Sequence, residues 1–159
     1  MKRREFLSFG AATLAIAPAL LSAKDFRKEK PDVWTTKNVY DGDKPTEKGV
    51  EEAIKKLYGD VKPEEKGIKL KTPEVANNGG QIPIGIKSDI AAKTVAVFQD
   101  VNPESAVAVF TVPDGQPVDY LIKIKMKKTG SVTVILEGKD GKFYKASNHF
   151  KVALGGCEG

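Results

Sequence analysis

The chain has 159 residues, and its 26 lysine and arginine residues against 21 aspartate and glutamate residues give a formal net charge of +5 at pH 7. That length is typical of one domain that can bury a single hydrophobic core without disulfide bonds. The positive excess is small and spread among acidic residues, which argues against a nucleic-acid-binding protein.

The first 23 residues predict an export signal. Their basic start contains the pair Arg3 and Arg4, as in a twin-arginine signal, and an apolar stretch over 9–21 follows. This stretch is shorter than the ~20 residues that cross a bilayer. We therefore expect cleavage after Ala23 or, alternatively, after Ala19, and no membrane span after processing; an uncleaved anchor is the other interpretation. Because the twin-arginine route carries folded proteins, the signal predicts a periplasmic protein that is exported already folded.

The next segment, 24–45, is polar and contains two prolines, so it predicts an irregular N-terminal lead in which Trp34, Val39 and Tyr40 could contact the body. A single helix is predicted over 46–58, where Thr46 is expected to cap the start and Gly59 to end it. Its apolar residues recur at helical spacing and comprise Val50, Ala53, Ile54 and Leu57.

Beyond Pro63 the pattern changes to short strands separated by turn residues. Strands are expected at 68–72, 81–88, 94–99, 106–112, 118–127, 131–137, 142–147 and 149–153. Regular spacing of this kind predicts a mainly β fold, an antiparallel immunoglobulin-like β-sandwich. The domain organisation is then a helix plus sandwich over 46–153 and a flexible C-terminal arm over 154–159.

A basic stripe lies at the end of one predicted strand and comprises Lys123, Lys125, Lys127 and Lys128. Alternation with apolar residues places these lysines on one strand face. Such a face is solvated in many proteins and discourages edge-to-edge aggregation. The alternative, more specific interpretation is that these lysines form a docking patch for an acidic partner.

The only cysteine, Cys157, is the third residue from the C-terminal end of the sequence, after Gly155 and Gly156 and before Glu158 and Gly159. The two glycines place no side chain between the last strand and the sulfur, which predicts a mobile tether. Exported cysteines normally occur in pairs. A lone one therefore predicts an intermolecular disulfide, a reactive thiol or a covalent attachment point.

Conventional catalytic motifs are missing from the sequence. The single histidine, His149, lies eight residues before the cysteine on an extended segment, too far for a Cys-His pair within one molecule. No spacing of acidic, histidine or cysteine residues suggests a metal site, and no phosphate-binding loop is present. The sequence thus predicts neither catalytic residues nor a cofactor or metal of its own.

Several ordered segments resemble the SoxY family of periplasmic sulfur carriers. The tail Leu-Gly-Gly-Cys-Glu-Gly is similar to the family's Gly-Gly-Cys-Gly-Gly ending, and further similarity extends over the whole chain, twin-arginine signal included. The other matching segments lie at 72–79, 82–84, 102–103 and 122–126.

This resemblance implies a function and a set of partners. Members of the family carry thiosulfate-derived sulfur covalently on the cysteine while separate enzymes act on it, so the chain itself is not expected to be an enzyme. The implied partners are a SoxZ-like β-sandwich subunit in a heterodimer, a thiosulfate-loading c-type cytochrome complex, a di-manganese hydrolase that releases sulfate and, in some organisms, a molybdenum sulfane dehydrogenase.

One residue departs from the family pattern. Glu158 replaces the glycine after the cysteine, which restricts the arm and places a carboxylate beside the sulfur, where it disfavours the thiolate. Carrier function remains the main hypothesis. The alternative is an exported β-sandwich adaptor that dimerises through a Cys157 disulfide.

Overall fold

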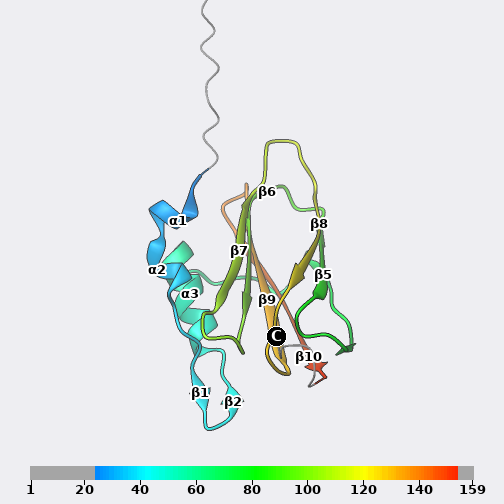
Figure 1. Cartoon of the computed structure of the whole chain (residues 1–159). Coiled ribbons are helices and arrows are strands. Elements are labelled where there is room, and N and C mark those ends of the chain that lie inside the picture. Colours follow the sequence, from blue (N-terminus) through cyan, green and yellow to red (C-terminus); the bar gives the residue numbers. More distant parts are fainter. Residues whose placement is uncertain (1–23, 154–159) are drawn as a thin grey trace, which may run out of the picture.

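The computed structural model describes residues 24–153 as a sandwich of two β-sheets with helices on one outer side (Figure 1). The larger sheet has the strand order β4-β10-β9-β6-β7 and the smaller one the order β3-β5-β8. The larger sheet contains β4 (Val75–Ala76), β6 (Ala92–Gln99), β7 (Ala106–Thr111), β9 (Gly130–Gly138) and β10 (Phe143–Val152). The smaller sheet contains β3 (Lys69–Lys71), β5 (Ile82–Ser88) and β8 (Val118–Ile124).

The main core lies between the two sheets. Strand β5 alternates strictly, so that Ile82, Ile84 and Ile86 are fully buried and the residues between them point away from the core. Val95 and Val97 of β6 belong to the same buried cluster from the other sheet. This arrangement confirms the predicted mainly β sandwich.

A second core lies on the outer face of the larger sheet. There α1 (Phe26–Glu29), α2 (Pro31–Trp34) and α3 (Lys48–Tyr58) form a helical layer. The buried side chains of α3 pack with Ala96, Phe98 and Ile135 of the sheet. The central strands of the larger sheet are therefore buried on both faces, which explains their continuous apolar runs.

The predicted helix is confirmed as α3, and it ends at Gly59, whose φ of 82° only glycine adopts easily and whose N–H donates to the Lys55 carbonyl. The predicted capping role of Thr46 is wrong. Glu47 occupies the N-cap position, while the Thr46 hydroxyl donates to the Val39 carbonyl at 2.7 Å.

The lead over 24–45 is more ordered than predicted. It contains the two short helices α1 and α2 and a hairpin of β1 (Tyr40–Asp41) and β2 (Lys44–Pro45). Trp34 packs against the second core, and the Tyr40 hydroxyl donates to the Val101 carbonyl. These contacts hold the lead against the sandwich, as the aromatic residues suggested.

Three strand predictions need correction. The ranges 142–147 and 149–153 form one continuous strand, β10, because its ladder with β9 is unbroken from Phe143 to Phe150 and Asn148 takes part in it. Strand β4 was not predicted, and it pairs with β10 in parallel, so the sandwich is not purely antiparallel. Strand β8 ends at Ile124, three residues earlier than expected.

Candidate functional site

The cysteine-bearing tail continues from the end of β10. We call this strand end, together with the hydrogen bonds that fix it, the tail root. Ala153 is the last residue that the structure describes. The predicted arm residues Gly155, Gly156, Cys157, Glu158 and Gly159 lie outside the described residues, as do Arg3 and Arg4 of the predicted signal.

Two neighbouring segments anchor the tail root. On one side, the parallel pairing with β4 lets the Lys151 N–H donate to the Glu74 carbonyl at 3.1 Å and the Ala153 N–H donate to the Ala76 carbonyl at 2.9 Å. On the other side, the Val152 N–H donates to the Thr129 hydroxyl at 3.0 Å. Bonds on both sides fix the position and direction of the chain where the tail begins.

Thr129 and β4 were missed as site residues. The segment 72–79 contributed to the family resemblance, but its two-residue strand is too short to show a period-2 pattern. In the sequence, Thr129 is recognisable only as part of a turn. Neither the resemblance at 72–79 nor the turn at Thr129 shows that these residues contact β10. The local sequence pattern therefore could not predict the tail root.

The loop between β6 and β7 supports the same end of the sandwich. The Gln99 side-chain carbonyl accepts the N–H groups of Val101 and Asn102, both at 2.7 Å. The Asn102 amide in turn donates to the Lys125 carbonyl at 2.7 Å and accepts the Lys127 N–H at 3.1 Å. The segment that carries the basic stripe is thus held in a defined position next to the tail root.

The basic stripe divides into two parts. Lys123 is exposed on β8, as predicted, and Lys125 is exposed directly after the end of that strand. Lys127 and Lys128 lie beyond the strand end, and their ammonium groups stand 5.4 and 4.5 Å from the Tyr40 ring centroid. Lys128 also donates to the Asp43 carbonyl at 2.8 Å, so this half of the stripe packs against the β1–β2 hairpin.

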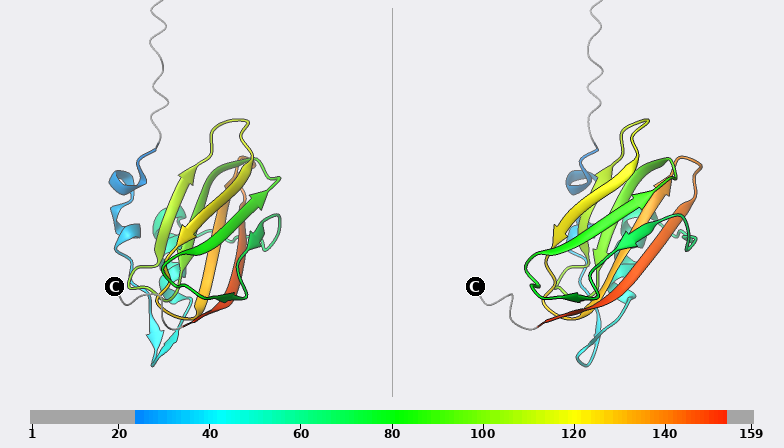
Figure 2. Two further views of the ribbon diagram at one scale, coloured as in Figure 1. Left: turned by 45° about the vertical axis from the view of Figure 1, so that its right-hand side comes forward. Right: turned by 90° about the vertical axis from the view of Figure 1, so that its right-hand side faces the viewer.

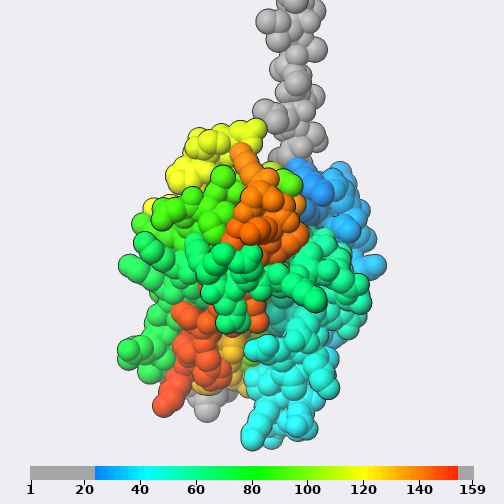
Figure 3. Space-filling model, turned by 180° about the vertical axis from the view of Figure 1, so that it is seen from behind, coloured from blue at the N-terminus to red at the C-terminus, as the bar shows by residue number. Residues whose placement is uncertain are grey.

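The views agree on where these elements lie. The end of β10 and the β1–β2 hairpin occupy the same end of the molecule (Figures 1 and 3). In the side views β10 descends along one margin of the sandwich to this end, where the strand finishes (Figure 2). The tail root is therefore at the tip of the sandwich, away from the helix α1.

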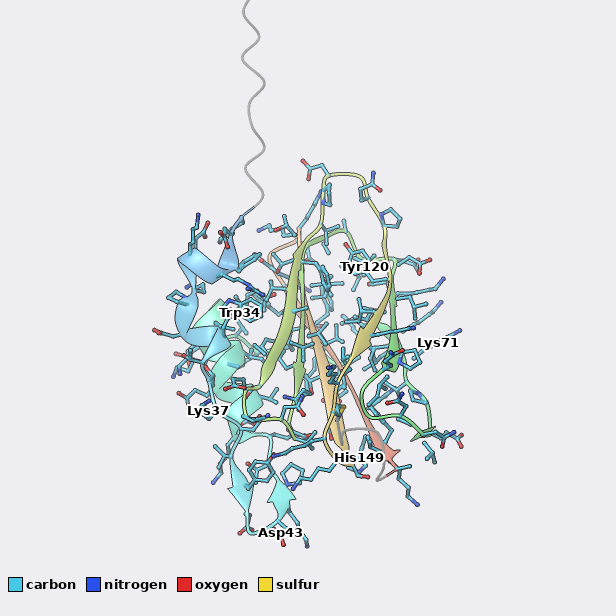
Figure 4. The ribbon with its side chains drawn as sticks, viewed as in Figure 1. Trp34, Lys37, Asp43, Lys71, Tyr120 and His149 are labelled. Carbon is cyan, nitrogen blue, oxygen red and sulfur yellow. The ribbon has the colours of Figure 1, made fainter. Side chains whose placement is uncertain are left out.

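His149 lies on the exposed side of β10, close to this end (Figure 4). Its Nδ1 is 3.2 Å from the Ser131 hydroxyl across the β9–β10 ladder. Within residues 24–153, no group of three or more histidine, cysteine, aspartate or glutamate residues is arranged to hold a metal ion. Nor is any helix of this part of the chain long and apolar enough to cross a membrane.

The largest pKa shifts belong to tyrosines that support the fold. Burial raises the pKa of Tyr58, whose hydroxyl is 2.8 Å from that of Thr94. The hydrogen bond to Asp140, 2.6 Å long, raises the pKa of Tyr144 to about 12 and lowers the pKa of the Asp140 carboxyl. Both pairs are structural contacts and neither faces the tail root.

Comparison with known proteins gives two informative matches. Residues 54–157 match the family model "Sulfur oxidation protein SoxY", a range that includes Cys157. Among solved structures, the sulfur carrier protein SoxY from Chlorobium limicola f thiosulfatophilum has 28% sequence identity and a TM-score of 0.60, covering 65% of this chain and 90% of that chain.

Other comparisons are weaker. Superoxide reductase (Neelaredoxin) from Ignicoccus hospitalis has 15% identity and a TM-score of 0.49, covering 55% of this chain and 81% of that one. A similarity this low supports no argument about function. The curated proteins contain no match to the chain.

Proposed function

The chain belongs to the SoxY family of sulfur oxidation proteins, and from that premise we propose that it carries thiosulfate-derived sulfur covalently on Cys157. The observation that carries the proposal is the range of the family match, which continues past the sandwich to residue 157 and so includes the only cysteine of the chain. A sulfur-carrier role is the general function of the family; the attachment site is the proposal.

The tail root supports this assignment by fixing where the arm starts. Three residues separate Ala153 from Cys157, so the Cα atom of Cys157 can lie at most about 14 Å from that of Ala153, the last anchored residue. That reach is enough to enter the cleft of a separate enzyme while the sandwich stays outside. The anchors at Thr129 and Ala76 would keep β10 in place as the arm is drawn in.

The chemistry requires two enzymes and no cofactor on this chain. Loading joins the Cys157 sulfur to the sulfane sulfur of thiosulfate, which releases one proton and two electrons, and a c-type cytochrome complex would accept the electrons. Hydrolysis of the resulting thiosulfonate by water then releases sulfate and leaves a persulfide, a step that suits a di-manganese hydrolase. A molybdenum sulfane dehydrogenase would oxidise the remaining sulfur where it is present.

Assembly and location complete the proposal. The processed chain would form a heterodimer with a SoxZ-like β-sandwich subunit and work in the periplasm after twin-arginine export. Replacement of Arg3 and Arg4 by lysine should leave both subunits in the cytoplasm. Normal periplasmic amounts of either subunit in that variant would contradict the export route.

The experiment that tests the carrier role is intact-mass analysis of protein purified from cells that oxidise thiosulfate. We expect sulfur-containing adducts that a reductant removes, and none on Cys157→Ser. An unmodified mass in all growth conditions, together with full thiosulfate oxidation by the Cys157→Ser strain, would contradict the proposal. A disulfide-linked dimer as the only active form would favour the adaptor alternative.

A further inference from the structure

The outer face of the smaller sheet is not covered by any element that the structure describes. The alternating side chains of β3, β5 and β8 that point away from the core form it, and we call it the open face. The open face comprises Lys69, Lys71, Pro83, Gly85, Lys87, Asp119, Leu121 and Lys123. On its edge the alternation continues past β8, where Lys125 is exposed between the buried Ile124 and Met126.

Charge on the open face is strongly one-sided. Lys87 pairs with Asp119 at 2.8 Å. Lys69, Lys71 and Lys123 have no carboxylate of the described residues within 4.0 Å, and the same holds for Lys125. Many lysines on the rest of the surface do pair, for example Lys55 with Asp60 at 2.9 Å. The open face therefore presents a positive field that the protein does not neutralise.

An exposed apolar residue, Leu121, lies among these lysines on the edge strand β8. Leu121 is 77% exposed, the largest exposure among the large hydrophobic side chains that the structure describes. On the neighbouring strand β5, Leu121 is paired with Gly85, which has no side chain. Gly85 is paired in turn with Lys71 of β3. The surface beside the leucine is therefore shallow. An apolar anchor with a polar rim is the usual composition of a protein interface.

The open face also runs toward the tail root. Strand β8 leads through Lys125 to Thr129, whose hydroxyl holds Val152, and the Met126 N–H donates to the Gly79 carbonyl just before β5 begins. Figure 4 shows Lys71 extending outward on the side of the sandwich opposite Trp34 and the helices. A protein that receives the tail at this end of the sandwich would meet the open face with its adjoining surface.

We propose that the open face is the docking surface for the enzyme that loads Cys157, and that the surface it contacts is acidic around a shallow apolar pocket. The inference rests on the proposed carrier function. Lysines that face an acidic partner steer the encounter and raise the association rate at low salt. Leu121 would then fill the pocket and slow dissociation.

The test measures loading of the full chain, in complex with its partner subunit, by the purified thiosulfate-loading cytochrome complex. In Lys71→Glu/Lys123→Glu we expect the loading rate at subsaturating carrier to fall at least tenfold in about 20 mM salt, and this defect to shrink in about 300 mM salt, where surface charges are screened. Leu121→Ser should lower loading severalfold, with little dependence on salt.

The matched control is Lys30→Glu/Lys48→Glu, which makes the same change in net charge on the helical side. It should load within twofold of the wild type. All variants should react equally fast with a small disulfide reagent, because the thiol itself is unchanged.

Two results would overturn the inference. The first is loading of Lys71→Glu/Lys123→Glu within twofold of the wild type in low salt, or a defect equalled by the control. The second is failure of this variant to co-purify with the partner subunit, because the face would then belong to the subunit interface. Absence of loading on wild-type Cys157 would instead reject the carrier function itself, so the two failures are distinguishable.

Discussion

The two sheets of the sandwich differ in how many of their faces are buried. Strand β6 of the larger sheet is buried at every position except Lys93, because the smaller sheet covers one face and the helical layer covers the other. Strand β8 of the smaller sheet alternates between exposed residues and residues that are buried or half-buried. One sheet is therefore buried on both faces while the other keeps one face in solvent, and we expect the larger sheet to supply more of the stability. Four substitutions test this division, in order of decreasing expected effect.

The largest effect is expected at Phe98, which is fully buried between the larger sheet and the helices. Phe98→Ala should lower the free energy of unfolding by about 3–5 kcal/mol, because it leaves a cavity in a packed core. Denaturant unfolding measures the change. Leu121→Ala on the open face is the control and should change stability by less than about 0.5 kcal/mol. Equal losses in the two variants would contradict the division.

Asn38 joins the N-terminal lead to the larger sheet. Its amide donates to the carbonyls of Gln99 and Asn102 at 2.9 and 2.8 Å, and its side-chain oxygen accepts from Ser105 at 2.8 Å. Asn38→Ala should cost about 1–3 kcal/mol of unfolding free energy because these partners lose their bonds away from water. Thr35→Ala, at an exposed position in the same lead, serves as control. A stability change no larger than the control's would show that the lead is not part of the cooperative fold.

Thr129 lies between β8 and β9, and its hydroxyl anchors the end of β10 at the tail root. Thr129→Val keeps the side-chain shape but removes the acceptor of the Val152 N–H, and should cost about 1 kcal/mol. Amide hydrogen exchange should accelerate at Val152 and Ala153, while β6 stays protected. Unchanged exchange at Val152 would show that this hydrogen bond does not hold the strand end.

The smallest effect is expected for Tyr144→Phe, which removes the hydrogen bond to Asp140 and should lower the melting temperature by only a few degrees. The pKa of Asp140 is lowered, so its contribution is present above the unfolded carboxyl pKa and is lost as pH falls below about 4. The pKa of Tyr144 is raised to about 12, so the contribution of its hydroxyl to stability is fully present below about pH 10. It is lost as the pH rises from about 10 through about 12.

Melting curves of the wild type and Tyr144→Phe should therefore differ by a constant amount between about pH 5 and 9 and converge in acid. A difference that grew on acidification would show that the bond does not depend on the ionised carboxylate. Phe143→Tyr, one residue away, is unsuitable as a control because its ring packs against Tyr58 at 5.1 Å. Tyr120→Phe is the better comparison, since its ring contacts Phe110 and its hydroxyl bonds to no carboxylate within residues 24–153.

Much of the fold could be predicted from the sequence because local patterns report it directly. The helical spacing of Val50, Ala53 and Leu57 predicted α3, and the alternation in β5 predicted a strand with one buried face. Glycine turns marked most strand ends. The failures occurred where a contact outside the local pattern decided: Thr46 bonds to Val39 instead of capping the helix, and the unpredicted strand β4 pairs with β10, far along the chain.

For the candidate site, the sequence by itself determined which chemistry to expect: one cysteine, a glycine-rich segment before it and an ordered set of family segments predicted a sulfur carrier. Only the tertiary structure decided how the end of β10 is anchored and which face leads toward it. The parallel β4–β10 pair and the Thr129 bond join segments that are many residues apart, and so does the register of Leu121 with Gly85. A side-chain period shows which residues share a strand face, but not which strand lies next to it.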